Sequence, residues 1–400
     1  MRLNILLFIL LLSANLLGQT DSTNVHFKWY KNNLAFTVAY INGSVAPTNV
    51  FVRGNNLNSV KIDRFQALNF KLSTQTSGKS ENERVFNYPL WGLGCKILDF
   101  NNLNEIGIPV AVYGFVDWPV FRGSKYFINA EMGFGLSFNW HSFNPLTNKF
   151  NIALGLGQAF MSDAGLTFNY ELSEHIDLLA GVNFTHYSNG AIKMPNYGIN
   201  SYAPKIGLKY NFFKKPEFVN KKIDKYYPEN EIIISTFAGI KNIIFDSINT
   251  NIAEKYEGVF FPFYGISALF NRQITRMSKI GAGFTLNVND AINAQIKVDN
   301  NELIDVDAPF LNQIQLSVYP SYTFCVDKIS IVLQPAFYIY RKTSKNQSPV
   351  FHQRISINYQ ITNNIFAGIT LRDYSMHADF VEWTIGYRLK KTDNHNQKIN

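Results

Sequence analysis

The sequence predicts an all-β protein, a transmembrane antiparallel β-barrel of the class found in outer membranes. The 400 residues include 34 Phe and 21 Tyr, and only 16% are charged. Many short segments alternate apolar and polar residues and are separated by Asn, Asp, Gly, Lys and Ser, the pattern of membrane strands joined by turns. Beyond the N-terminus, no apolar run approaches the roughly 20 residues of a transmembrane helix. A secreted β-sandwich is the alternative, but it would not need so many aromatic residues.

The first residues have the pattern of a secretory signal peptide. Met1 and Arg2 precede the apolar residues 5–12, and the small residues Ser13, Ala14 and Gly18 follow. The apolar core is too short to span a bilayer. We therefore expect residues 1–19 to direct export, so that the mature chain lies in the cell outer membrane.

Candidate strands divide the chain into two halves. The first half contains residues 34–47, 60–72, 86–100, 106–119, 126–140, 150–160, 164–172, 176–188 and 202–213. The second half contains residues 232–243, 259–273, 280–288, 311–326, 329–340, 350–361, 365–375 and 380–389. A charged, proline-containing connector at 214–231 separates the two parts, 20–213 and 232–389. The hydrophilic segment 289–308 is expected outside the membrane, and a polar tail occupies 390–400.

Alternation along residues 202–213 assigns the two faces of a strand. Tyr202, Ile206 and Leu208 share one face, whereas Lys205 and Lys209 share the other. The lysines predict that the second face lines a wet lumen. About 16 strands fit one wide barrel or two barrels of about eight strands. Because two complete barrels in one chain are uncommon, we expect one barrel of about 14–16 strands, with two tandem barrels as the alternative.

Two short sequence segments in the first half of the chain have similar counterparts in the second half. Leu179-Ala-Gly-Val-Asn-Phe-Thr-His-Tyr-Ser188 is similar to Phe366-Ala-Gly-Ile-Thr-Leu-Arg-Asp-Tyr-Ser375, and Gly207-Leu-Lys-Tyr210 is similar to Gly386-Tyr-Arg-Leu389. Duplication is one interpretation. The other is that strands under the same in–out rule converge on similar words.

Other residues restrict the partners and cofactors. Cys95 and Cys325 are far apart in the sequence, and we expect separate thiols. The net charge of +8 is compatible with a phosphate-rich membrane surface. The histidines lack metal-ligand spacing, and no phosphate-binding or calcium-binding loop occurs. We therefore expect membrane lipids as partners, no nucleic acid and no cofactor; the sequence leaves the oligomeric state open.

His186 and Ser188 end an otherwise apolar stripe. Leu178, Val182 and Phe184 occupy the same parity, which we expect to face lipid. Serine needs a base within hydrogen-bond reach to act as a nucleophile, and two residues at i and i+2 on one strand face can supply this pair. The amides after Ser188, with Asn189 and Gly190, are candidate oxyanion donors. The alternative is an ordinary polar strand end.

The wider context favours chemistry. The run His186-Tyr-Ser-Asn-Gly-Ala-Ile-Lys-Met-Pro195-Asn196-Tyr-Gly198-Ile-Asn200 resembles the lipid A 3-O-deacylase family of outer-membrane barrels, which carries a His-aromatic-Ser-Asn motif followed by a Pro-Asn-x-Gly turn. Residues 108–113 and 151–157 are similar to segments of Bacteroidetes-type acyloxyacyl hydrolases. The resemblance covers roughly residues 85–213.

The resemblance implies a serine esterase that removes an ester-linked acyl chain from lipid A in lipopolysaccharide. Ser188 would be the nucleophile, His186 the general base and Asn189 part of the oxyanion hole. The glutamate that completes the family's triad is replaced by Asn200. Its parity places it beside His186 on the next antiparallel strand, where an amide oxygen can accept from imidazole but carries no full charge. We therefore expect weaker catalysis than with a carboxylate.

The remaining candidates have weaker support. Asp163 is the nearby carboxylate, but its parity predicts a lumenal or rim position. Asp373, Ser375 and His377 share one face near the C-terminus without the surrounding motif, which is typical of a strand end. Two alternative functions remain open: an outer-membrane pore with a degenerate esterase motif, and a purely structural barrel.

Overall fold

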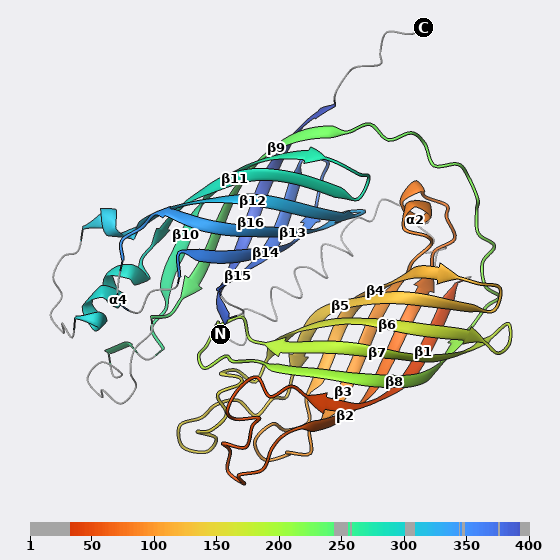
Figure 1. Cartoon of the computed structure of the whole chain (residues 1–400), viewed down its shortest axis with the longest axis horizontal. Helices are drawn as coiled ribbons and strands as arrows, with labels where there is room; N and C mark the ends of the chain where they lie inside the picture. Colours follow the sequence, from red (N-terminus) through yellow and green to blue (C-terminus); the bar gives the residue numbers. More distant parts are fainter. Residues whose placement is uncertain are drawn as a thin grey trace, which may run out of the picture.

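The computed structural model describes residues 33–243, 255–256, 258–300, 309–343, 345, 349–374 and 377–392. These residues form two closed antiparallel β-barrels, each of eight strands, with few helical segments (Figure 1). The predicted signal peptide at 1–19 lies outside the described residues, as does most of the polar tail. None of the described helices is long and apolar enough to span a bilayer.

The first barrel closes before the connector. Its strands are β1 (Leu34–Val45), β2 (Arg64–Gln75), β3 (Leu90–Asp99), β4 (Val110–Arg122), β5 (Tyr126–Phe138), β6 (Ala159–Glu171), β7 (Ile176–Ser188) and β8 (Ile199–Asn211). Each strand pairs with the next, and β8 returns to β1 in the register Ala35↔Asn211 to Val45↔Ser201.

The second barrel repeats this topology. Its strands are β9 (Glu229–Lys241), β10 (Phe261–Gln273), β11 (Ser278–Asn289), β12 (Ile314–Val326), β13 (Ile329–Tyr340), β14 (Phe351–Gln360), β15 (Ile365–Tyr374) and β16 (His377–Thr392). Here β16 closes the ring on β9. The prediction of a membrane-type β-barrel is confirmed in its two-barrel form, and the preference for one barrel of 14–16 strands was wrong. Alternation within each strand is the same in both arrangements and does not determine which terminal strands pair.

Side chains fill the interior of the first barrel. Lys71 on β2 reaches Asp117 on β4 at 3.3 Å and Glu131 on β5 at 3.4 Å, while Lys205 on β8 pairs with the same Glu131. Lys96 Nζ lies 3.1 Å from Asp163 Oδ1. All these groups are buried except Asp163, which is half-buried. The inward parity predicted for the lysines is confirmed, but the wet lumen is not, because an eight-stranded ring is narrow enough for side chains to cross it.

The second barrel is filled by arginines. Glu382 accepts from Arg372 at 2.7 Å and from Arg354 at 2.9 Å, and all three side chains are buried. Arg372 also lies over the Phe263 ring, with 4.7 Å to its centroid. Nearer the other end, Lys279 pairs with Glu231 at 2.7 Å.

The two ends of the first barrel differ. We call the end that carries the segments 46–63, 100–109, 139–158 and 189–198 the loop end, and the opposite one, with turns at 123–125 and 172–175, the turn end. At the loop end the segments bury a hydrophobic cluster of their own, in which Trp140 packs on Phe100 at 5.6 Å and on Tyr187 at 5.1 Å. The inward-facing Tyr187 thereby anchors the end of β7 beneath the loops.

This cluster explains an incorrect strand prediction. Residues 150–158 form a loop rather than a strand, and β6 begins at Ala159. Their apolar side chains, including Ala153 and Leu154, are buried among the loops. In the second barrel, the hydrophilic segment predicted at 289–308 contains the helix α4 (Ala291–Asp299), and residues 301–308 lie outside the described part. Neither Cys95 nor Cys325 forms a disulfide, as predicted.

The barrels contact each other near both ends. At the turn end, the short helix α2 (Glu81–Val85) carries Glu81, whose carboxylate lies 2.8 Å from Arg276 of the second barrel. Nearby, Phe324 packs against Phe86 at 6.4 Å. At the loop end, a Cβ added to Gly190 would lie 2.6 Å from Val381 Cγ2, so β16 packs directly on the segment that follows β7.

The recurring sequence segments lie in equivalent strands of the two barrels. Leu179 pairs with Gly207 between β7 and β8, and Phe366 pairs with Gly386 between β15 and β16. Each pair therefore lies in the last hairpin of its barrel with the same register. This equivalence favours duplication over convergence.

Candidate active site

His186 and Ser188 lie at the loop end of β7, on the outer surface of the first barrel. Leu178, Val182 and Phe184 on the same parity are exposed, whereas the intervening Asn183 and Thr185 are buried inside. The predicted outward orientation is confirmed. His186 is half-buried, and Ser188 is 7% exposed because the loops fold over it.

Asn200 holds the histidine ring. It is the direct partner of His186 in the β7–β8 register, and its Oδ1 lies 2.6 Å from His186 Nδ1. Its amide Nδ2 donates to Thr48 Oγ1 at 3.2 Å, which directs Oδ1 toward the ring. With an acceptor at Nδ1, the ring carries its proton there and leaves the Nε2 lone pair free for base chemistry. The predicted proximity of Asn200 and His186 is confirmed.

Ser188 is surrounded by hydrogen-bond donors. The backbone amide of Gly190 and Asn196 Nδ2 each donate to Ser188 Oγ at 3.1 Å. Asn189 is differently engaged, because its backbone amide donates to Asn196 Oδ1 at 2.8 Å and its Nδ2 donates to the Lys193 carbonyl at 2.7 Å. The structure therefore brings Gly190 to the serine but turns both donors of Asn189 elsewhere.

Asn196 is the residue that sequence reasoning missed. It belongs to the Pro-Asn-x-Gly turn, eight positions after Ser188 in the chain, yet it contacts both Ser188 Oγ and the Asn189 amide. The only signal in the sequence was its place in the motif, since loop conformation is not encoded by strand parity. Its side chain keeps the segment after Ser188 closed on the serine.

The loops hold this segment from behind. The amides of Tyr197 and Gly198 donate to the carbonyls of Ile152 and Ala153 at 3.2 and 2.9 Å. Gly198 has φ +70°, and a Cβ there would lie 2.9 Å from His186 Cε1. Glycine is therefore required both by the backbone conformation and by the approach of the ring. The residues mispredicted as a strand thus support the site.

Among the described contacts, His186 and Ser188 have no hydrogen bond to each other. They share one strand face at i and i+2, so rotation of the Ser188 side chain is the movement that would bring its hydroxyl toward Nε2. Hydrogen bonds of catalytic pairs are often long in the absence of substrate. The resting serine is instead held by Gly190 and Asn196.

The surface beside the serine is apolar. Phe160 lies opposite Ser188 on β6 and stacks on Phe134 at 6.1 Å, and Phe184 and Tyr202 are exposed next to it. Met194 is 50% exposed on the following loop. An acyl chain lying along the barrel would therefore meet aromatic and aliphatic side chains up to the level of the serine.

The other predicted candidates lie apart. Asp163 faces inward and pairs with Lys96, as its parity predicted. Lys205, predicted on the inner face, is buried in its pair with Glu131 and does not reach the outer surface. Ser375 lies outside the described residues. Within the described part of the chain, no group of His, Cys, Asp and Glu side chains is arranged to hold a metal ion.

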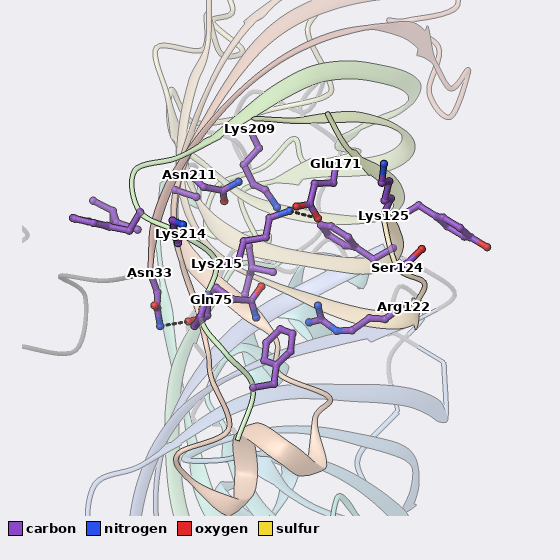
Figure 2. A pocket seen from close by; sticks show the side chains of 18 of the residues that line it. Asn33, Gln75, Arg122, Ser124, Lys125, Glu171, Lys209, Asn211, Lys214 and Lys215 are labelled. Atoms are coloured by element: carbon purple, nitrogen blue, oxygen red, sulfur yellow. Dashed lines mark hydrogen bonds and ion pairs between the residues drawn. The ribbon is translucent and has the colours of Figure 1, made fainter. Parts of the chain in front are cut away.

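A cavity of about 160 Å³ lies at the turn end of the first barrel, whereas Ser188 lies at the loop end. Figure 2 shows side chains that line this cavity. Lys215 crosses it to Glu171 at 2.9 Å and to Asp177 at 2.8 Å, and Lys209 reaches the other oxygen of Asp177 at 2.8 Å. These carboxylates neutralise the lysines, and no nucleophile and base are paired here. We therefore place the candidate site at the loop end.

Two family models match the chain. Residues 68–209 match the model of lipid A 3-O-deacylase (PagL), and residues 230–391 match that of the acyloxyacyl hydrolase C-terminal domain. The first contains His186, Ser188, Asn196 and Asn200. The boundary between the matches falls in the connector between the barrels. No curated protein matches the chain.

Several solved structures match the chain at low identity and low TM-score. The ferric enterobactin receptor of Pseudomonas aeruginosa in complex with enterobactin matches at 12% identity and TM-score 0.24, over 86% of this chain and 54% of the receptor. CdiB of Acinetobacter baumannii matches at 7% and 0.19, over 90% and 60%, and the Rhodopseudomonas blastica porin at 8% and 0.19, over 89% and 99%. This chain spans about half the length of that receptor. Similarity at this level carries no argument about function.

Proposed function

The chain belongs to the lipid A 3-O-deacylase family, and on that premise we propose that it is an outer-membrane serine esterase that removes an ester-linked acyl chain from lipid A. The observation that carries the proposal is the grouping of Ser188, His186 and Asn200 on the lipid-facing side of β7 and β8. The acyl ester then reaches the serine sideways from the membrane.

In the proposed reaction, Ser188 Oγ attacks the ester carbonyl carbon and its proton passes to His186 Nε2. Asn200 Oδ1 accepts from Nδ1–H and keeps the ring oriented as it becomes charged. The carbonyl oxygen becomes an oxyanion near the two donors that hold the resting hydroxyl, Gly190 N–H and Asn196 Nδ2. The oxyanion role predicted for Asn189 is better assigned to Asn196, because the donors of Asn189 are engaged.

The tetrahedral intermediate then collapses. The C–O bond to the sugar breaks, and the sugar oxygen takes the proton from His186 Nε2. Water, activated by the same nitrogen, attacks the acyl-serine and releases the fatty acid. This sequence needs no cofactor, and Asn200 supplies orientation without the full negative charge that would stabilise an imidazolium.

Orientation in the membrane follows from the loops. Barrels of this class have short turns on the periplasmic side and longer loops outside, so the loop end with Ser188 faces the outer leaflet, where lipid A resides. Export would depend on residues 1–19, which we propose as the signal peptide. Neither eight-stranded interior favours the pore alternative, because buried side chains occupy both.

The test is mass spectrometry of lipid A from cells that express the wild-type chain or Ser188→Ala. We expect lipid A with one acyl chain fewer in the wild type only. A matched Ser173→Ala variant, at the opposite turn end of the same barrel, should behave as the wild type. Identical spectra for the wild type and Ser188→Ala would refute the esterase.

A further inference from the structure

A cavity opens between the segment after Ser188 and the loop end of the second barrel. Ala191 and Met194 line it from the first barrel, and Lys241, Asn289, Gln315 and Arg341 are among the residues that line it from the second. The first two residues lie three and six positions beyond the proposed nucleophile. The cavity therefore borders the segment that follows the proposed nucleophile and is closed on its other side by a domain to which the proposed chemistry gives no role.

Direct packing fixes the distance between the serine and this cavity. A Cβ added to Gly190 would lie 2.6 Å from Val381 Cγ2 of β16, so this strand packs closely on Gly190, whose amide donates to Ser188 Oγ. Lys241 at the end of β9 is anchored by Asp379, with its Nζ 2.6 and 2.8 Å from the carboxylate oxygens. The wall of the cavity that belongs to the second barrel thus packs against the segment that holds the proposed oxyanion donors.

The cavity wall has the chemistry of a sugar site. Asn289, Gln315 and the neighbouring Gln295 contribute amides, Tyr338 and Tyr374 contribute aromatic rings with hydroxyls, and apolar side chains such as Ile243 and Ile292 line the rest of the wall. Such a mixture of amides, hydroxyls and aromatic faces suits a carbohydrate, which offers hydroxyl groups and apolar C–H faces. A purely acyl substrate would require none of these polar groups.

The charge of this end favours an anion. Arg341 lies over the Tyr338 ring, with 4.7 Å to its centroid, and Lys241 shares the cavity with it. Below them, the buried Arg354 and Arg372 share Glu382. Of the charged residues that line the cavity itself, Lys241 and Arg341 are cationic, and Asp379, which neighbours both, is the carboxylate. Guanidinium groups bind phosphate oxygens through paired hydrogen bonds.

Resting on the proposed function, we propose that the loop end of the second barrel is the subsite for the phosphorylated glucosamine head group of the lipid substrate, with Arg341 as its phosphate ligand. The acyl chain lies along the apolar surface at Phe184, the ester lies at Ser188, and the head group extends over Ala191 into the cavity. The first barrel supplies the reaction, and the second supplies recognition of the head group.

Measurements of lipid binding test the head-group subsite independently of the proposed esterase activity. In detergent, the affinities of phosphorylated and enzymatically dephosphorylated lipid A are measured for full-length Ser188→Ala, which needs no turnover. We expect the dephosphorylated lipid to bind about tenfold more weakly, as expected for the loss of one charge-assisted contact. Adding Arg341→Gln should weaken binding of the phosphorylated lipid by the same factor and leave the dephosphorylated lipid unchanged.

Two controls accompany it. Arg341→Lys keeps the charge and should retain most of the preference, and Lys214→Gln removes an exposed lysine at the turn end and should retain all of it. Heat-modifiable gel mobility verifies that each variant is folded. Equal affinity for the two lipids, or equal weakening of both by Arg341→Gln, would overturn the subsite even if the wild type deacylates lipid A. If the wild type does not deacylate lipid A but Ser188→Ala still prefers the phosphorylated lipid, the esterase alone is refuted.

A competition experiment tests whether the sugar is recognised together with the phosphate. Inorganic phosphate should displace the lipid only weakly if the sugar is also recognised. Full displacement at low phosphate concentration would indicate a free-phosphate site and overturn the proposal.

Discussion

The two barrels share one architecture and differ at the loop end. Both have eight strands, the same in–out alternation and equivalent last hairpins. In the first barrel, packed loops close over Ser188 and Tyr187 lies in their core. In the second, the mouth carries α4 and a cavity lined by both polar and apolar side chains. The comparison indicates that the strands provide a common scaffold, and that the segments at the loop end determine the function of each barrel.

The interiors differ as well. Lysines pair with aspartates and glutamates in the first barrel, whereas in the second two arginines share Glu382. The guanidinium group of Arg372 also lies over the rings of Phe263 and Phe380. The same ring size is thus filled by two different charge arrangements, and each can be disturbed separately.

The largest expected effect separates the barrels by activity. His186→Ala removes the proposed base and should lower the deacylation rate by a factor on the order of 10³. Ser375→Ala, at the position in the second repeat that corresponds to Ser188, should leave the rate unchanged. Rates are measured by release of fatty acid from lipid A in mixed micelles. A large loss with Ser375→Ala would contradict the assignment of chemistry to the first barrel alone.

Stability should separate the interiors. Glu382→Gln leaves Arg354 and Arg372 buried without their shared carboxylate, and we expect it to lower the free energy of unfolding by about 3 kcal/mol. Denaturant unfolding of the protein in lipid vesicles measures the change. Gln334→Leu is a suitable control, since it removes only a neutral partner of Arg354. Equal stability of Glu382→Gln and the wild type would show that the arginines need no shared anion.

Substitution of Asn196 tests whether the segment after β7 contributes to catalysis at Ser188. Asn196→Ala removes a donor to Ser188 Oγ and the acceptor of the Asn189 amide, and should lower kcat by about 10²-fold with little change in KM. Asn144→Ala, in another loop of the same barrel, provides the comparison. A change confined to KM would assign Asn196 to substrate binding instead.

The smallest expected effect is a gain. Asn200→Asp keeps the shape of the side chain and supplies the missing charge beside His186 Nδ1, and should raise kcat about tenfold because charged hydrogen bonds are stronger. Thr48 Oγ1 can donate to the new carboxylate. Thr48→Val in the wild-type background should lower kcat slightly by releasing the Asn200 amide. If Asn200→Asp has a lower kcat than the wild type, the neutral amide at position 200 suits catalysis better than a carboxylate.

Strand periodicity was sufficient to predict much of the site. The outward parity of His186 and Ser188, and the position of Asn200 across from the histidine, follow from alternation and antiparallel pairing. Ring closure could not be predicted, because alternation is identical in one barrel of sixteen strands and two of eight. The role of Asn196 and the loop at 150–158 were missed for a related reason: their partners are set by packing among loops, which has no period in the sequence.

The buried ion pairs of the first barrel have a consequence for assembly. A competing sixteen-stranded ring would pair β1 with β16, and doubling the length of the closed loop costs only about 0.6 kcal/mol of closure entropy. Chain entropy therefore discriminates weakly between the two circumferences. Lys71, Lys205 and Glu131 meet across the interior only when the ring is narrow; in the wide ring each would stand alone. These ion pairs therefore stabilise the eight-stranded ring relative to the sixteen-stranded ring.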